Sequence, residues 1–186
     1  MPLRCVYTDL DGTLLGRWGS LFRDSEGEFS MLQARALEAC HRADVEVVIK
    51  SGRREASVLE VAKLIGSRSY ICEVGCLVVI DGERTELVGD AEAEKGKTLA
   101  ETMVDRGIPD QLFEHFADRL EWHSPWHRQR ELSLLFRGKV DVREANELLA
   151  AEGHAGLRLV DNGEIGPDMH TFHLIPAEVS DRKSVV

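Results

Sequence analysis

The sequence has few positive charges, few aromatic residues and no long hydrophobic run. Its 23 lysines and arginines are outnumbered by 33 aspartates and glutamates, which gives a formal net charge of -10. Nucleic-acid-binding proteins normally present a basic face, so this balance predicts no nucleic-acid partner. No apolar stretch approaches the length that spans a bilayer, and residues 1–4 lead into a strand-like segment rather than a signal peptide. We therefore expect no membrane partner and a cytoplasmic location.

Cysteine is also scarce. The four cysteines lie in or beside apolar segments and lack the paired spacing of metal ligands; they are Cys5, Cys40, Cys72 and Cys76. We interpret them as reduced core residues, with a redox or metal role as the alternative.

The segment that ends the first apolar run carries the most informative pattern. Residues 5–7 are followed by Asp9 and Asp11, one residue apart, and then by Gly12. This order is typical of a buried strand that ends in a sharp bend. Both carboxylates then enter the space beyond the strand, which suits a nucleophile that also binds a cation beside an acid that moves protons. A hairpin turn is the alternative, but residues 16–27 are polar and glycine-rich and do not resemble a second strand.

Strand and helix patterns alternate through the first half of the chain. Residues 45–50 and 70–74 have strand character, and residues 55–65 predict a helix with Val58, Val61, Ala62 and Ile65 inward. Another helix is expected to start at a capping box at residues 30–33, to end near Ala43, and to keep one side apolar through Leu32, Ala36, Ala39, Cys40 and Ala43. This β-α-β-α-β order predicts an α/β fold with a parallel sheet, in which Asp9, Asp11 and Ser51 gather at the carboxyl edge.

The pattern changes after Gly75 to that of an inserted α+β module. Residues 76–80 and 86–88 flank Asp81-Gly82 as a hairpin, and Asn162-Gly163 marks a second hairpin between residues 157–160 and 171–175. Helices are expected at residues 96–106 and 110–121 and from a capping box at 141–144, and a strand at 132–136. We predict a core of residues 1–81 and 176–186 and an insert of residues 82–175.

Three segments resemble the motifs of the haloacid dehalogenase-like (HAD) phosphatases. Residues 9–15 resemble the first motif, Ser51-Gly52-Arg53 after a strand resembles the second, and residues 175–183 lead to Lys183 as the third. The insert between the second and third motifs resembles the C2B type of cap found in subfamily IIB. Within that subfamily the chain most resembles the mannosyl-3-phosphoglycerate phosphatase and sucrose-phosphatase branch. The resemblance implies a HAD-like Rossmannoid core with a C2B-type cap.

The resemblance also implies roles for the catalytic residues. Asp9 would form an aspartyl phosphate, Asp11 would be the acid/base, and Ser51 and Lys183 would offset charge on the phosphate. Acid/base work requires the pKa of Asp11 to lie near the working pH. Two acids and a dianionic phosphate need a cation, so Mg²⁺ is expected, held by the Asp9 carboxylate and the Asp11 carbonyl oxygen.

Substrate contacts are less tightly specified. The expected contact residues are Gly12, Gly52, Arg53 and Arg130. Arg53 has helix capping as its alternative role. His123 and His127 stand four apart, as in some metal sites, but Pro125 breaks the helix that would align them, so we favour a cap loop.

The fourth HAD motif, an acidic magnesium ligand after the third motif, is not found before Val186. We expect the chain to be a fragment, or to associate with itself or another partner over the incomplete sheet edge. The predicted function is a Mg²⁺-dependent phosphatase of a small phosphorylated metabolite, of the sugar phosphate or glycosyl-phosphoglycerate type. A phosphomutase, or an incomplete HAD-like chain that binds a ligand or partner without turnover, remains the alternative.

Overall fold

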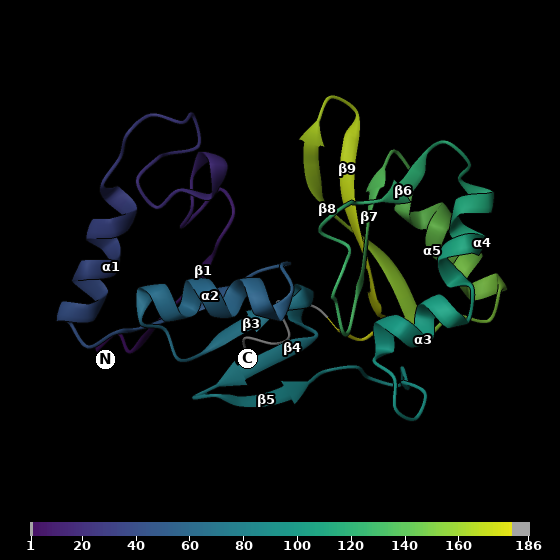
Figure 1. Cartoon of the computed structure of the whole chain (residues 1–186), viewed down its shortest axis with the longest axis horizontal. Coiled ribbons are helices and arrows are strands. Elements are labelled where there is room, and N and C mark those ends of the chain that lie inside the picture. Colours follow the sequence, from purple (N-terminus) through teal and green to yellow (C-terminus); the bar gives the residue numbers. More distant parts are fainter. Residues whose placement is uncertain (1, 180–186) are drawn as a thin grey trace. The chain divides into compact units, whose positions relative to one another are not determined.

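The computed structural model describes residues 2–179 and forms two compact units, divided between Thr85 and Glu86. Each unit has its own sheet and its own hydrophobic core, and each is described by itself (Figure 1). The predicted division into a core of residues 1–81 and 176–186 and an insert of 82–175 stays a prediction.

The first unit is built around a mixed five-stranded sheet with the order β1-β2-β3-β4-β5. Its strands are β1 (Cys5–Asp9), β2 (Glu46–Lys50), β3 (Tyr70–Cys72), β4 (Leu77–Ile80) and β5 (Glu83–Glu86). β1, β2 and β3 are parallel, whereas β4 runs antiparallel to β3. The connections between the parallel strands contain α1 (Leu32–Arg42) and α2 (Glu55–Ile65). The predicted α/β class and parallel core are confirmed.

Helix α2 matches its sequence pattern closely. Val58, Ala62 and Ile65 are buried at a spacing of three or four residues, so they lie on one face of the helix. Gly66 ends the helix in the left-handed conformation that glycine adopts without strain. The helix contacts β3, whose residues Tyr70, Ile71 and Cys72 are also buried.

Helix α1 departs from its sequence pattern at its start. The residue before the helix is Met31, which makes no side-chain cap hydrogen bond, and Leu32 is 73% exposed. Leu37 is the buried residue of this helix. The predicted capping box and apolar side are therefore wrong. The cap position is Met31 rather than Ser30, and the helix faces the core through Leu37 rather than Leu32. Its end at Arg42, with Ala43 as the cap, agrees with the expectation.

The second unit is an antiparallel sheet packed with three helices. Its strand order is β6-β7-β9-β8, and its largest buried side chains include Phe116, Phe136 and Phe172. The strands are β6 (Leu120–Trp122), β7 (Leu134–Gly138), β8 (Leu157–Gly166) and β9 (Met169–Pro176), and the helices are α3 (Leu99–Asp105), α4 (Ile108–His115) and α5 (Val142–Ala151). Thr98 and Glu101 form a capping box on α3, and Asp141 caps α5.

Two hairpins of the sequence analysis differ from the structure. Residues 162–163 lie inside β8, at a register shift between Asp161 and Glu164, and the chain turns only after Gly166. A bulge accommodates Asn-Gly without ending the strand pair, so the turn signal was misread. Asp81-Gly82 does form a turn, with φ of 51° and 89°, but β5 follows at once at residue 83 rather than at 86.

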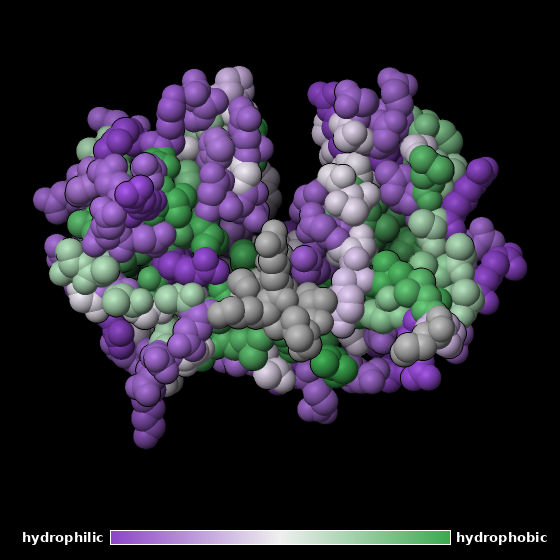
Figure 2. Space-filling model, turned by 180° about the vertical axis from the view of Figure 1, so that it is seen from behind, coloured by the Kyte–Doolittle hydropathy of each residue, from purple (hydrophilic) through white to green (hydrophobic). Residues whose placement is uncertain are grey.

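The surface of the first unit exposes several large hydrophobic side chains. They include Leu3, Tyr7, Phe29 and Leu32, and Figure 2 shows hydrophobic residues at the surface of this unit. Among the described residues β1 is the outermost strand of its sheet, so self-association over that edge stays a prediction. No helix within residues 2–179 is both long and apolar enough to cross a membrane. The cytoplasmic location is not tested by this finding.

Candidate active site

The turn after β1 is held by its own backbone. Leu10 is fully buried, and its carbonyl oxygen accepts hydrogen bonds from the amides of Thr13 and Leu15. The Gly12 amide donates to the Leu15 carbonyl oxygen at 2.8 Å, with Gly12 at φ +80°. A side chain at this φ would be strained, so glycine is required for the tight turn. Leu14 and Leu15 are buried beside it and anchor the loop, which leaves Asp11 at the surface.

Parallel pairing brings Asp9 and Ser51 to the same end of the sheet. Asp9 is in register with Lys50, the residue before Ser51. Ser51 is only 5% exposed, and its Oγ accepts a hydrogen bond from the Arg53 amide at 3.2 Å. Its hydroxyl proton can still be donated to a ligand oxygen.

Arg53 connects the two loops directly. Its Nε donates to Asp11 Oδ2 at 2.9 Å and its Nη2 to Asp11 Oδ1 at 2.5 Å, a bidentate ion pair. The two side chains are 33% and 58% exposed, respectively. The cap position of α2 is Arg54, which makes no side-chain cap hydrogen bond, so Arg53 does not serve as the helix cap.

The Ser51 loop is supported from behind by an unusual turn after β3. Three successive residues, Glu73, Val74 and Gly75, have φ of 48°, 59° and 94°. A β-branched valine in this region costs on the order of 1–2 kcal/mol. The Glu73 amide donates to the Arg53 carbonyl oxygen at 3.0 Å, and the Val74 amide to that of Ser51 at 3.4 Å. This turn therefore ties both ends of the Ser51–Arg53 segment to β3.

The oxygen atoms at the end of β1 fit a small divalent cation. The carbonyl oxygens of Asp9 and Leu10 accept hydrogen bonds from the loop, whereas among residues 2–179 that of Asp11 accepts none. The Asp11 carbonyl oxygen and the Asp9 carboxylate are hard oxygen ligands of the kind Mg²⁺ prefers. Within the described residues no group of three or more His, Cys, Asp or Glu side chains is arranged to hold a metal. A cation at this site would therefore keep several waters.

The two remaining predicted site residues are Lys183 and Arg130. Lys183 lies outside the described residues. Arg130 belongs to the second unit, in the segment that follows β6. Asp9, Asp11, Gly12, Ser51, Gly52 and Arg53 all belong to the first unit.

Arg130 is a buried cation in the second unit. It is 8% exposed, and it donates to Ser133 Oγ at 3.0 Å and to the Trp126 carbonyl oxygen at 3.4 Å. Burial, followed by the positive charge of Arg130, holds the pKa of the nearby His173 well below its usual range. Burial likewise lowers the pKa of His123, with contributions from Arg137 and Arg130. Both imidazoles are thus kept neutral around the arginine.

Arg130 also lines a cavity of about 530 Å³ in the second unit. Trp122 and His127 contribute a stacked pair with ring centroids 5.0 Å apart, while His123 stacks on Trp126. The two histidines thus lie in the loop after β6 and face different tryptophans, as the cap-loop interpretation expects. The remaining lining residues are Lys97, Ala100, Glu101, Val104, Asp105, Gln129 and Leu134.

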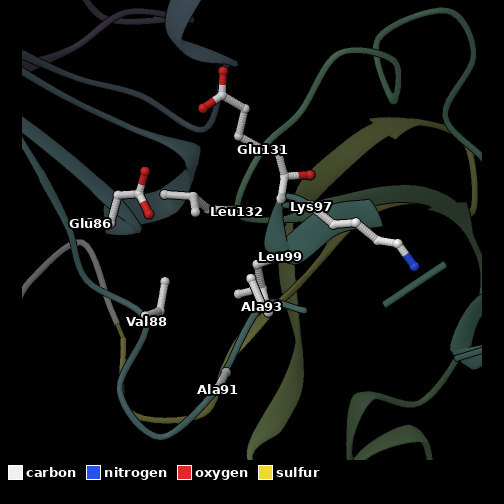
Figure 3. Close-up of a pocket in the computed structure, with 9 residues that line it drawn as sticks. Glu86, Val88, Ala91, Ala93, Lys97, Leu99, Glu131 and Leu132 are labelled. Carbon is white, nitrogen blue, oxygen red and sulfur yellow. The ribbon is translucent and has the colours of Figure 1, made fainter. Parts of the chain in front are cut away.

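A second cavity of the same unit, of about 170 Å³, has a different character (Figure 3). Its walls are mostly apolar, from Val88, Ala91, Leu99 and Leu132, and its acidic groups are Glu86 and Glu131. Lys97 extends away from the other labelled side chains in Figure 3, and its Nζ contacts Glu94 and Asp105. An anionic ligand is therefore disfavoured in this cavity.

The sequence analysis did not single out the loop of residues 16–30 that follows the site. In this loop Trp18 is 77% exposed, and the guanidinium carbons of Arg17 and Arg23 lie 5.2 and 5.3 Å from the centroid of its ring. The signal in the sequence was two arginines and a tryptophan within a glycine-rich stretch directly after the Asp9–Leu15 segment.

Comparison with known proteins assigns this architecture. The family model of haloacid dehalogenase-like hydrolases matches residues 6–127. The chain is 28% identical over 185 residues to a phosphoglycolate phosphatase from Archaeoglobus fulgidus, covering 98% of this chain and 67% of that protein. It is 34% identical over 102 residues to a phosphoglycolate phosphatase from Pyrobaculum neutrophilum, covering 55% of this chain but 42% of that protein. The chain thus spans less than half of the Pyrobaculum relative.

Solved structures agree on the fold. Protein 0175 of Thermoplasma acidophilum has a TM-score of 0.63 at 16% identity, covering 98% of this chain and 68% of that one. BT4131, described as a HAD subclass IIB sugar phosphatase, has a TM-score of 0.53 at 16% identity, covering 98% of this chain and 73% of that one. These likenesses concern the fold, whereas subfamily IIB and the mannosyl-3-phosphoglycerate and sucrose-phosphatase branch stay predictions.

Proposed function

This chain belongs to the family of haloacid dehalogenase-like hydrolases, and from that premise we propose that it hydrolyses phosphomonoesters of small metabolites. One observation carries the proposal: the register of β1 with β2 sets Asp9 beside the Ser51 loop, where Arg53 reaches Asp11. Carboxylates, a hydroxyl and a guanidinium converge there, as phosphoryl transfer requires.

The proposed reaction proceeds in two displacements. An Asp9 carboxylate oxygen attacks phosphorus, the bond to the leaving oxygen breaks, and Asp11 gives that oxygen a proton. Water then attacks phosphorus of the aspartyl phosphate, the bond to Asp9 breaks, and Asp11 recovers a proton from the water. Ser51 donates its hydroxyl proton to a phosphoryl oxygen throughout. The substrate's phosphoryl group competes with Asp11 for the Arg53 guanidinium.

A bound Mg²⁺ would supply charge compensation between the phosphoryl group and Asp9. The Asp9 carboxylate and the Asp11 carbonyl oxygen would hold it, and the Gly12 turn keeps that carbonyl fixed. Lys183 would add a second positive charge, as the family resemblance implies.

Arg130 is proposed to contact the substrate, as the family resemblance implies. The cavity holds an arginine tied to Ser133 and a stacked indole–imidazole pair, which together suit a polar, partly planar group. The relatives' names make phosphoglycolate the first substrate to test. Sugar phosphates and phosphoglycerate derivatives come next.

The proposal is tested by phosphate release from these substrates, with Mg²⁺ and with EDTA. The chain is compared with its Asp9→Asn variant and with Asp90→Asn, a matched change at an exposed aspartate outside the site. We expect release that needs both Mg²⁺ and Asp9 and that survives the control change. Absence of release from a folded chain, or release that survives Asp9→Asn, would contradict the proposal.

A further inference from the structure

The loop of residues 16–30 follows the Asp9–Leu15 segment and holds two arginines over one indole, and we propose that Arg17, Trp18 and Arg23 bind the leaving group of the substrate and favour one that carries a second anionic group. This inference rests on the proposed function and concerns specificity. The three residues are called the arginine–tryptophan cluster below.

The loop lies next to the catalytic groups. It follows the Asp9–Leu15 segment directly, and Figure 1 shows it beyond the end of β1. A Cβ atom added to Gly19 would lie 3.8 Å from Nη2 of Arg53, the nitrogen that contacts Asp11. The backbone next to Trp18 is therefore in van der Waals reach of the Arg53–Asp11 pair.

The loop is held in this shape by close backbone contacts. The Arg17 amide donates to the Asp24 carbonyl oxygen at 2.9 Å, and the Gly16 amide to that of Ser20 at 2.9 Å. A Cβ atom at Gly16 would lie 1.9 Å from the Arg23 carbonyl oxygen, so only glycine allows this approach. The cluster is thus built on a defined turn.

Trp18 combines a strained backbone with an exposed ring. Its φ of 62° is in the left-handed region, which costs on the order of 1–2 kcal/mol for a residue other than glycine. Burial of the ring does not compensate, since the residue is 77% exposed. Strained, exposed aromatic residues of this kind are typical of ligand contacts.

The two guanidinium groups suit an anion. Each lies over the indole, which restricts its rotamers and leaves N–H groups at its edge for an acceptor. Both arginines are exposed, and among residues 2–179 neither forms an ion pair with a carboxylate. Their side chains donate to the backbone carbonyl oxygens of Glu26 and Gly27. In a chain of net charge -10, two such cations beside a phosphate site select for a carboxylate or second phosphate on the leaving group.

The kinetic test compares two substrates of similar size. Phosphoglycolate carries a carboxylate, whereas 2-hydroxyethyl phosphate carries a neutral hydroxyl. For Arg17→Gln/Arg23→Gln we expect kcat/KM to fall about tenfold or more for phosphoglycolate and less than about threefold for 2-hydroxyethyl phosphate, because only the first loses charge-assisted hydrogen bonds. The matched control is Arg42→Gln/Arg143→Gln, which changes the net charge equally at two exposed helix positions. It should lower kcat/KM by less than about threefold for both substrates, because exposed charges act only through screened long-range attraction.

The binding test does not depend on turnover. Trp18 is one of three tryptophans, so its own emission is the part of the signal that Trp18→Phe removes while Trp122 and Trp126 stay in place. In the Asp9→Asn chain, saturating phosphoglycolate should change the Trp18 part of the emission, and Arg17→Gln/Arg23→Gln should weaken the titration about tenfold or more. Arg17→Lys/Arg23→Lys, which keeps the charge, should recover part of the binding.

The outcomes separate this inference from the proposed function. A Trp18 response that needs Arg17 and Arg23, without phosphate release, would support the cluster and contradict the hydrolase. The proposed role of the cluster would be overturned if Arg17→Gln/Arg23→Gln left the ratio of the two kcat/KM values unchanged, or if Trp18 emission did not respond to the ligand. Phosphate release would still support the hydrolase in either case.

Discussion

Two arginines, one in each unit, are held in opposite ways. Arg53 of the first unit is one-third exposed and grips the carboxylate of Asp11, whereas Arg130 of the second unit is buried and donates to a hydroxyl and a carbonyl oxygen. An exposed ion pair contributes at most about 1 kcal/mol and exchanges partners readily. A buried arginine is fixed by its surroundings. The difference separates an adaptable sheet edge, proposed as catalytic, from a preformed cavity that is proposed to contact substrate.

The largest effect on activity is expected in the first unit, at Asp11. Asp11→Ala should lower kcat on phosphoglycolate by roughly 10²–10⁴-fold, since the leaving oxygen loses its proton donor. The loss should be much smaller for 4-nitrophenyl phosphate, whose leaving group departs as a stable anion. Steady-state kinetics with both substrates measure this, and an equal loss for the two would refute the acid role.

Arg53→Gln should have the second-largest effect on activity. We expect kcat/KM to fall roughly tenfold to a hundredfold, because a charge-assisted contact to the phosphoryl group is lost. The free energy of unfolding should change by less than about 1 kcal/mol, since the Asp11 partner is exposed. Arg42→Gln, which breaks an exposed pair with Glu38, is the control for both measurements. A large loss of stability would show that the pair is structural.

Arg130→Met should instead have its main effect on the free energy of unfolding. It removes the buried hydrogen bond that the charged guanidinium donates to Ser133 Oγ, and the loss of such a bond costs about 1–3 kcal/mol in the free energy of unfolding. Urea denaturation gives the value, and the exposed Arg143→Gln in the same unit is the control. If Arg130 also contacts substrate, KM should rise while kcat changes little. Unchanged stability would place Arg130 outside the structural core of its unit.

The smallest effect is a pH dependence that should be confined to the second unit. His173 has its pKa lowered by burial and by Arg130, so the unfolded chain binds a proton that the folded chain does not. Stability is therefore unaffected above the unfolded value of about 6.5 and falls as the pH drops below it, by at most about 1.4 kcal/mol per pH unit. His173→Gln should flatten this slope in urea titrations between pH 7 and 5. An equal slope in the variant would assign it to other groups.

The sequence predicted what depends on strand order and could not predict what depends on side-chain direction. Asp9 ends β1 and Ser51 follows the adjacent parallel strand β2, so their placement at one end of the sheet follows from topology. The ion pair between Arg53 and Asp11 joins residues 42 apart in the sequence. It depends on side-chain rotamers, which a hydrophobic pattern does not predict. Leu32 was expected inward because its spacing fits a helix, but the helix faces the core through Leu37.

The same limit applies to turns. Asn162-Gly163 and Asp81-Gly82 look alike in sequence, yet the first is a bulge within β8 and the second is a tight turn. What separates them is pairing with β9 over its full length, a long-range property. The arginine–tryptophan cluster was missed because its stretch is polar and glycine-rich, which resembles an ordinary surface loop.

The left-handed turn at residues 73–75 allows the opening of the Ser51 loop to be measured. Its amides at Glu73 and Val74 are bonded to the carbonyl oxygens of Arg53 and Ser51, so the loop cannot lift away from β3 without releasing both. The rate of deuterium uptake at these two amides therefore reports how often the loop opens. A ligand that slows both amides together would be recognised as a ligand of this loop even where no product is formed.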